Sequence, residues 1–349
     1  MATITDVARI AQVSIATVSH VINGTKNVSV TTRKRVEAAI ETSRFVPNIG
    51  AQSLRNGRTR SIGLVASDVT QHVFGKMIGE IEREARSEGQ TLFLANSGED
   101  REQEREVVRA LLDRRVDGLI VAPVADSDRT IVDMCLAVNC PLVFVDRNRD
   151  PSQDQVGINN RLAMAALTSH LLETGFQRIA LIAGDPAVWT LRERISGFQD
   201  AFDRPEYTAK SVVVLTEHGL SDGQNEVEKL MSSDDRPDAV IAASASLTMG
   251  ALHAFAKLGL RFPQDVAFAS FDGVLNSEFF AAKLTCVVQP VEQIGIQAML
   301  LLRRRMDDPT APPRTVTASA TLFHGSSCGC DGRVALGPRV DYGDTITDF

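Results

Sequence analysis

The stretch TITDVARIAQVSIATVSHVIN at residues 3–23 decides the fold of the N-terminal part of the chain. Thr3 and Asp6 have the spacing of a capping box, in which a hydroxyl and a carboxylate satisfy free amides of a helix's first turn. Ser14 is a second N-cap candidate. The apolar residues that follow it fall on one helix face: Val18, Val21 and Ile22. This pattern predicts two short helices separated by a tight turn.

A third amphipathic segment follows at residues 33–43. Its apolar residues share a face: Val36, Ala39 and Ile40. Pro47 ends this segment, and Asn23-Gly24 end the helix before it, because both residues tolerate positive φ. Two short helices around a tight turn, with a third that completes a small core, form a helix-turn-helix layout. The sequence therefore predicts a small all-α head that can bind DNA.

The charge of the chain is distributed unevenly. Residues 1–60 hold nine Lys/Arg and three Asp/Glu, a net charge of +6. The remaining 28 Lys/Arg and 41 Asp/Glu give −13. A basic end on an acidic body indicates that nucleic acid is bound at one end only. On charge alone, a head surface that is basic by chance remains equally open.

Length and composition predict a water-soluble protein. A chain of 349 residues suggests two or three folded units, and 44% hydrophobic residues with a mean hydropathy of −0.03 supply a large core. The longest apolar runs have the length of strands, whereas a membrane-spanning helix needs about 20 residues. Asp6 and Arg9 stand where a signal peptide needs an apolar segment, so we predict a cytoplasmic protein.

The cysteines do not predict a disulfide framework, because their number is odd and they are sparse: Cys135, Cys140, Cys286, Cys328 and Cys330. The Cys-Gly-Cys at 328–330 lacks CxxC spacing and has no second Cys or His pair nearby in the sequence. His170 lies on an otherwise apolar helical segment and is predicted to pack there. We therefore predict reduced thiols, no metal and no cofactor.

The body alternates apolar, strand-like runs with helical stretches. The runs predict buried parallel strands at 62–66, 91–95, 118–122, 142–145, 179–183, 212–215, 239–243 and 266–271. Helices are predicted between them at 75–87, 102–112, 161–174, 194–202 and 247–258. The charged stretch 99–109 is predicted to be a solvated helix face. This alternation predicts doubly wound α/β sheets, and the number of strands indicates two lobes.

The chain resembles the LacI/GalR family of bacterial transcription regulators. The resemblance rests on TITDVA at 3–8, VS at 13–14, ATVSHVIN at 16–23, RKRVEAAI at 33–40 and FVPN at 45–48. The head is most similar to the purine-repressor branch of that family. About 325 residues are covered, and the resemblance weakens after Cys330. It implies a helix-turn-helix domain at 1–47, a hinge at 48–59 and a type I periplasmic-binding-protein-like body at 60–330.

The resemblance also implies the lobe boundaries. The N-lobe would comprise about 60–159 and 290–321, and the C-lobe about 161–288, with a third crossover near 321. The tail at 331–349 is predicted to be poorly ordered.

The resemblance assigns DNA contacts in the head and hinge. Ile15, Ala16 and His20 occupy base-reading positions, and His20 can donate to guanine. Phosphate contacts and caps are implied at Thr3, Ser14, Thr17, Ser19 and Asn23. In the hinge, Ala51, Leu54 and Arg55 would contact DNA, with Leu54 as a wedge in the minor groove. The alternatives are a solvent-facing His20 and a Leu54 that packs between domains.

Ligands of such sheets bind beyond the carboxyl ends of strands and between lobes. Candidate contacts there are Phe74, Asp146, Arg147, Asn160, Thr190, Arg194, His218, Ser244 and Asp272. Such groups suit a polyol, a sugar acid or a nucleobase, and the two arginines favour an anion. Pairing of the charged residues with each other is the alternative. Ser244-Ala245 replaces the family's usual Asn-Asp, which predicts an atypical ligand or a weakened response.

The sequence contains no P-loop, dinucleotide-binding, zincin or nucleophile-elbow motif, so we predict that the protein is not an enzyme. The function predicted is a repressor that binds a near-palindromic operator as a homodimer, or as a tetramer, under control of a small-molecule effector, with no membrane partner. Two alternatives remain: a repressor whose body only dimerises, and an enzyme or ligand carrier with an incidental helix-turn-helix.

Overall fold

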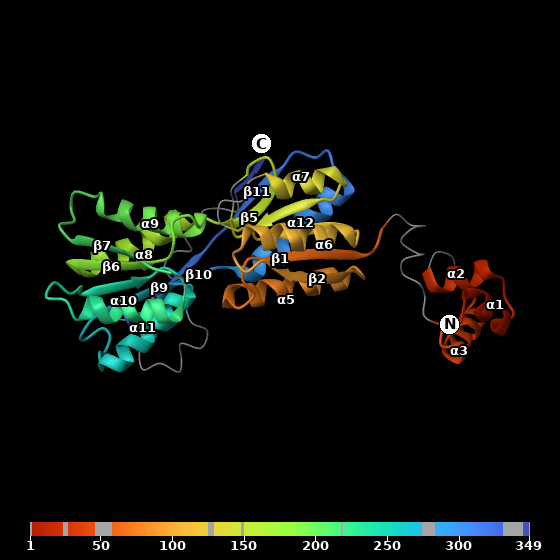
Figure 1. Cartoon of the computed structure of the whole chain (residues 1–349), viewed down its shortest axis with the longest axis horizontal. Helices are drawn as coiled ribbons and strands as arrows, with labels where there is room; N and C mark the ends of the chain where they lie inside the picture. The colour runs from red at the N-terminus through yellow and green to blue at the C-terminus, as the bar shows by residue number, and fades with distance from the viewer. Residues whose placement is uncertain are drawn as a thin grey trace. The chain divides into compact units, whose positions relative to one another are not determined.

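We analysed the protein in a computed structural model, which divides into two compact units, residues 1–59 and 60–349. The structure describes residues 2–23, 27–45, 58–124, 129–147, 150–217, 219–273, 283–330 and 345–348. Figure 1 shows the elements of each unit. No helix in the described part of the chain is long and apolar enough to cross a membrane.

The first unit contains three helices: α1 (Ile4–Ala11), α2 (Ile15–Asn23) and α3 (Val30–Ser43). The predicted capping box is present, with the Thr3 amide donating to Asp6 Oδ2 at 3.0 Å and the Asp6 amide donating to Thr3 Oγ1 at 3.3 Å. One small core joins the helices and includes Val7, Ala8, Ala11, Val18, Val21, Val36 and Ala39. The helix-turn-helix prediction is therefore confirmed.

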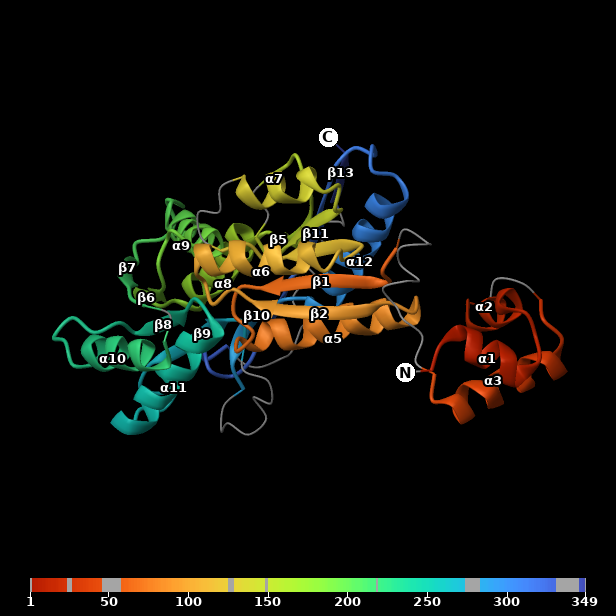
Figure 2. The same ribbon diagram turned by 45° about the vertical axis from the view of Figure 1, so that its right-hand side comes forward.

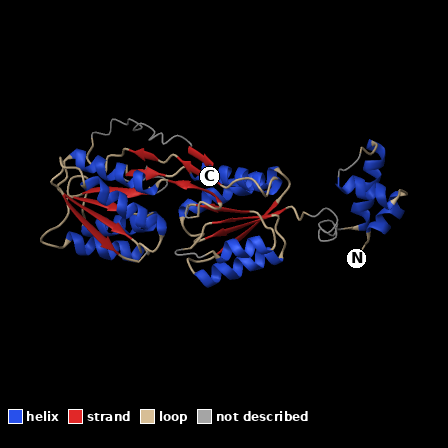
Figure 3. Cartoon of the chain, turned by 90° about the horizontal axis from the view of Figure 1, so that it is seen from above, coloured by secondary structure: helices blue, strands red, loops and turns tan. Residues whose placement is uncertain are grey.

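The second unit contains two α/β lobes, each built on a mainly parallel sheet (Figures 1 and 3). The first sheet has the strand order β13-β11-β5-β4-β3-β1-β2. Its strands are β1 (Ser61–Ala66), β2 (Thr91–Asn96), β3 (Gly118–Val121), β4 (Leu142–Val145), β5 (Asp154–Ile158), β11 (Arg314–Ala318) and β13 (Thr345–Asp348). Its helices are α5 (His72–Ser87), α6 (Arg101–Asp113), α7 (Thr130–Ala137) and α12 (Val291–Asp307).

The second sheet has the order β12-β10-β9-β8-β6-β7. Its strands are β6 (Arg178–Ala183), β7 (Lys210–Leu215), β8 (Ala239–Ala242), β9 (Ala267–Phe271), β10 (Thr285–Val288) and β12 (Thr321–Phe323). Its helices are α8 (Asn160–Thr174), α9 (Trp189–Phe202), α10 (Leu220–Met231) and α11 (Ala245–Leu258). In Figure 2, α10 and α11 lie together at this sheet, and α5 lies at the first one. The predicted α/β body of two sheets is confirmed.

Three expectations differ from the structure. Strand β2 was expected to be buried, but Phe93 is 40% and Leu94 48% exposed, because β2 is an edge strand with a neighbour on one side only. In the tail expected to be poorly ordered, Thr345–Asp348 forms β13, which pairs antiparallel with β11. The segment expected to be a solvated helix face includes Glu104, which is 1% exposed, and its buried carboxylate accepts from the Val124 amide at 2.9 Å.

We expect Gly197→Ala to lower the free energy of unfolding of the second unit by about 1–3 kcal/mol. A Cβ at Gly197 on α9 would lie 2.0 Å from the backbone oxygen of Arg161 on α8, so the two helices would have to separate. Gly79→Ala on α5 is the matched control, because a Cβ there meets nothing within 4 Å and alanine favours the helix. Urea unfolding measures both, and equal stability of the two variants would contradict this packing.

Candidate functional site

The first turn of α2 presents the candidate base-reading residues. Ile15 is 48% exposed and Ala16 is also exposed, whereas His20 is half-buried one turn further on. The hydroxyl of Ser14 accepts from the Thr17 amide at 3.1 Å, so Ser14 caps α2. The first turn of α2 can therefore meet base edges with apolar groups.

A side chain of α3 holds the turn before α2 in place through hydrogen bonds. Arg35 donates through Nη2 to the backbone oxygens of Ala11 at 2.5 Å and Gln12 at 3.3 Å. Thr3 serves α1 as its cap, and Ser19 and Thr17 are half-buried on α2. The side chain of Asn23 and the hinge residues Ala51, Leu54 and Arg55 lie outside the described residues.

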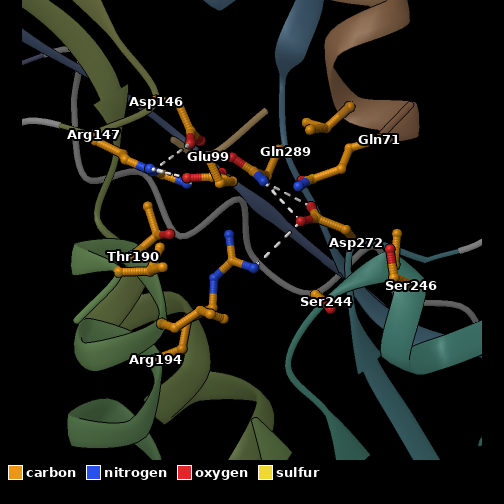
Figure 4. Close-up of a pocket in the computed structure, with 14 residues that line it drawn as sticks. Gln71, Glu99, Asp146, Arg147, Thr190, Arg194, Ser244, Ser246, Asp272 and Gln289 are labelled. Atoms are coloured by element: carbon orange, nitrogen blue, oxygen red, sulfur yellow. Dashed lines mark hydrogen bonds and ion pairs between the residues drawn. The ribbon is translucent and has the colours of Figure 1, made fainter. Parts of the chain in front are cut away.

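A pocket opens at the carboxyl ends of strands from both sheets of the second unit (Figure 4). It is lined by Gln71, Val73, Glu99, Asp146, Arg147, Val188, Thr190, Leu191, Arg194, Ser244, Ala245, Ser246, Asp272 and Gln289. Three of its carboxylate residues adopt positive φ: Glu99 at 60°, Asp146 at 67° and Asp272 at 61°. Non-glycine residues rarely adopt this conformation, and such strain is concentrated at functional sites.

The first lobe contributes a buried ion pair. Arg147, which is 4% exposed, donates to both oxygens of Glu99, at 2.6 and 2.9 Å, and to the Pro123 backbone oxygen at 2.6 Å. Burial disfavours the charge of Arg147, but the hydrogen bonds to Glu99, together with the attraction of nearby carboxylates, outweigh that effect and raise its pKa. Burial raises the pKa of the neighbouring Asp146 carboxyl. Arg147 is therefore a cation held in place by a carboxylate.

The second lobe contributes a network around Arg194, which is 5% exposed. Arg194 donates to Asn160 Oδ1 at 2.8 Å and to the Ala243 backbone oxygen at 2.8 Å, and its Nη1 lies 3.5 Å from Asp272 Oδ2. Its guanidinium also lies 3.7 Å from the ring centre of Phe271. Burial lowers the pKa of Arg194. The Gln289 amide, after β10, donates to both oxygens of Asp272 at 2.8 and 2.9 Å.

The structure gathers most, but not all, of the predicted ligand residues at this pocket. Six of them line it: Asp146, Arg147, Thr190, Arg194, Ser244 and Asp272. Asn160 is 1% exposed and lies behind Arg194, which it holds through its side-chain oxygen. Phe74 differs from its prediction, because it is 2% exposed within the core and its neighbour Val73 lines the pocket instead. His218 lies outside the described residues.

Several residues that line the pocket were not predicted from the sequence. Glu99 had been placed on a solvated helix, but it stands before α6 and pairs with Arg147. Gln71 is the N-cap residue of α5, and Gln289 follows β10 at a lobe crossover. The order of strands could have indicated Glu99, since β2 neighbours β1 and both end at the same edge.

The described lining residues carry two guanidinium groups and three carboxylates, and each guanidinium already has a carboxylate partner. The predicted alternative, that these charges pair with each other, is thus found in the structure. Nε of Arg147 and Nδ2 of Asn160 are buried and have no hydrogen-bond acceptor in the described structure. The pocket can offer carboxylate acceptors and amide and guanidinium donors to a polar ligand.

Comparison with known proteins assigns both units. Residues 3–48 match the model of bacterial regulatory proteins of the lacI family, and residues 59–324 match that of periplasmic binding proteins and the sugar-binding domain of the LacI family. The HTH-type transcriptional repressor PurR of Aliivibrio salmonicida is 31% identical over 310 residues, 88% of this chain and 93% of that protein. PurR of Aliivibrio fischeri strain MJ11 is 31% identical over 92% of this chain and 99% of its own length.

Solved structures agree. The Lac repressor bound to ONPG in the repressed state is 25% identical with a TM-score of 0.81, covering 93% of this chain and 99% of that one. The transcriptional regulator CelR in complex with cellobiose is 27% identical with a TM-score of 0.69, covering 94% of this chain and all of that one. On these matches, which span the head and the two-lobed body, the chain belongs to the LacI family of bacterial regulatory proteins.

Proposed function

We propose that this LacI-family transcriptional regulator represses transcription as a homodimer on a near-palindromic operator, and that a small molecule in the inter-lobe pocket controls its affinity. The observation that carries the proposal is the pocket in which both lobes place buried, strained and partly unsatisfied polar groups. The basic, compact head supplies one half-site contact per subunit.

Residues 48–59 are proposed to form a hinge helix that connects ligand binding in the pocket with operator binding by the head. This segment is short and contains Gly50, so it is marginal as an isolated helix. We propose that it folds when two copies meet on the operator, with Leu54 wedged in the minor groove and Ala51 and Arg55 at its edges. A ligand that changes the geometry of the lobes would then change the cost of folding the hinges.

We expect His20→Ala to relax sequence preference at one base pair of each half-site by about 1–3 kcal/mol. The reason is that an imidazole can donate to guanine N7 or O6, whereas a methyl group cannot. Binding to a set of operators with single base changes measures this effect. A uniform loss across all operators would show that His20 only positions the helix.

We propose that the effector is a neutral, polyhydroxylated molecule such as a sugar. The two arginines favoured an anionic ligand in the sequence, but this reason no longer holds in the structure. Arg147 and Arg194 are each paired with a carboxylate, and Asp146 adds a further carboxylate to the pocket. None of the described lining residues is aromatic, so they offer no ring for a nucleobase to stack on. Hydroxyl groups suit the remaining donors and acceptors.

Calorimetry of the full-length protein tests this proposal. The probes are ribose, glucose and cellobiose as neutral sugars, gluconate and glucose 6-phosphate as anions, and hypoxanthine as a nucleobase. We expect binding of a neutral sugar, and its loss in Asp272→Asn. Arg261→Gln is the control, because Arg261 pairs with Asp265 on the surface, away from the pocket lining. Binding of only the anions or only hypoxanthine would contradict the proposal.

One observation favours a second candidate, a repressor whose body only dimerises. The hydroxyl of Ser244 accepts from the Leu247 amide at 3.4 Å, so the residue that replaces the family's usual asparagine is used as the cap of α11. Ala245 has no polar group to offer. Absence of binding for all six probes, with operator binding intact, would favour this candidate.

A further inference from the structure

Three potential metal ligands meet at the end of the second sheet. His170 lies on α8, and Cys328 and Cys330 lie after β12. His170 Nε2 is 3.3 Å from Cys328 Sγ, which is 2.9 Å from Cys330 Sγ. All three ligand atoms lie within 4.8 Å of one another. The sequence could not indicate this cluster, because 158 positions separate His170 from Cys328.

The cysteine segment is held firmly against the sheet. Ser327 Oγ accepts from the Thr285 amide at 2.8 Å and donates to the Phe268 backbone oxygen at 2.6 Å. Gly325 leaves no room for a side chain, because a Cβ there would lie 2.2 Å from the Lys283 backbone oxygen. Gly329 turns the chain between the two cysteines with φ of 74°. The two thiols are therefore presented by an ordered, closely packed loop.

Further polar side chains surround these groups. Thr285 Oγ1 donates to Cys328 Sγ at 3.0 Å. The ring centre of His324 lies 4.5 Å from that of His170, edge to face. A second imidazole therefore stands beside the site.

We propose that His170, Cys328 and Cys330 bind one Zn²⁺ ion. Thiolate sulfur and imidazole nitrogen are the preferred ligands of this cation. Zn–S bonds of about 2.3 Å and Zn–N bonds of about 2.0–2.1 Å at tetrahedral angles require separations of roughly 3.8 Å between sulfurs and 3.6 Å between sulfur and nitrogen. The observed 2.9 and 3.3 Å need an opening of less than an ångström.

The ion would clip α8 to the end of the C-lobe sheet. The same helix begins at Asn160, which holds Arg194 at the pocket, so the clip and the ligand site share one rigid element. This proposal is independent of the identity of the effector, because none of the three proposed ligands lines the pocket.

The test uses the full-length protein, reduced, treated with a chelator and freed of it. We expect one equivalent of Zn²⁺ per chain by competition with a chromogenic chelator, a raised melting temperature with Zn²⁺, and thiolate-to-cobalt charge-transfer absorption when Co²⁺ is added instead. Cys330→Ser should weaken Zn²⁺ binding by at least about 100-fold and remove the shift in melting temperature.

Cys140→Ser is the matched control, since Cys140 is a half-buried thiol like Cys330 but lies in the first lobe. It should bind Zn²⁺ like the unmodified protein. His170→Gln should also lose binding, which separates the proposed site from any pair of thiols. The proposal is overturned if Zn²⁺ is not bound, if Cys330→Ser binds it as well as Cys140→Ser does, or if the reduced protein gives no cobalt charge-transfer bands.

Discussion

Val18→Asp is expected to abolish specific operator binding, with a loss of at least about 10³-fold in affinity. Val18 is 0% exposed in the core of the head, and a carboxylate cannot be buried in so small a core without unfolding it. An unfolded head keeps most of its positive charge but loses the geometry of α2, so only non-specific attraction to DNA would remain. Fluorescence anisotropy with an operator selected from random DNA measures the loss.

The matched control for this variant is Val30→Asp. Val30 is 72% exposed on the first turn of α3, where a negative charge is favourable for the helix. It adds the same charge to the same unit, and we expect less than about a tenfold effect. In both variants the second unit should melt at an unchanged temperature, because it is a separate compact unit. Equal loss of operator binding in the two variants would mean that charge, and not the fold of the head, causes it.

Arg194→Met is expected to lower the free energy of unfolding by about 3–5 kcal/mol and to abolish ligand binding. The substitution leaves the half-buried Asp272 without its cation, and it leaves Asn160 and the Ala243 oxygen without their donor. Arg161→Met is the matched control, because Arg161 pairs with Asp200 on the surface, where solvent screens the pair and it contributes little to stability. Urea unfolding and calorimetry with the neutral sugars measure the two effects.

A double variant separates stability from ligand binding. Arg194→Met with Asp272→Asn removes both charges, so it should recover part of the lost stability while ligand binding stays absent. Recovery of ligand binding in the double variant would mean that neither charged group contacts the ligand. Unchanged stability in Arg194→Met alone would contradict the buried network described here.

The head could be predicted almost completely because its signals are local. The capping box at Thr3 and Asp6 and the spacing of apolar residues lie within one or two helical turns. Ile10 is an exception, since it is 44% exposed although it fits the apolar pattern. Many strands were predicted for a similar reason, because continuous apolar runs leave little alternative to burial: β1, β3, β4, β6, β8 and β9.

The missed elements depend on partners that are distant in the sequence. Strand β5 begins with Asp154, whose buried carboxylate made the segment look unlike a core strand. Its charge is balanced by Arg304 and Arg305 on α12, some 150 residues later. Two other pairs also join residues that are distant in the sequence: Glu99 with Arg147, and His170 with Cys328. Such pairs form only after the sheet order is set, so spacing in the sequence cannot show them.

Ligand binding in the pocket is proposed to change the affinity of the protein for its operator. The deciding measurement is the operator affinity of the full-length protein with and without each of the six probes, in the unmodified chain and in Asp272→Asn. We predict that a neutral sugar changes operator affinity by about 5-fold or more, and that Asp272→Asn binds the operator but does not respond. A sugar that binds in calorimetry yet leaves operator affinity unchanged, or an undiminished response in Asp272→Asn, would contradict the account.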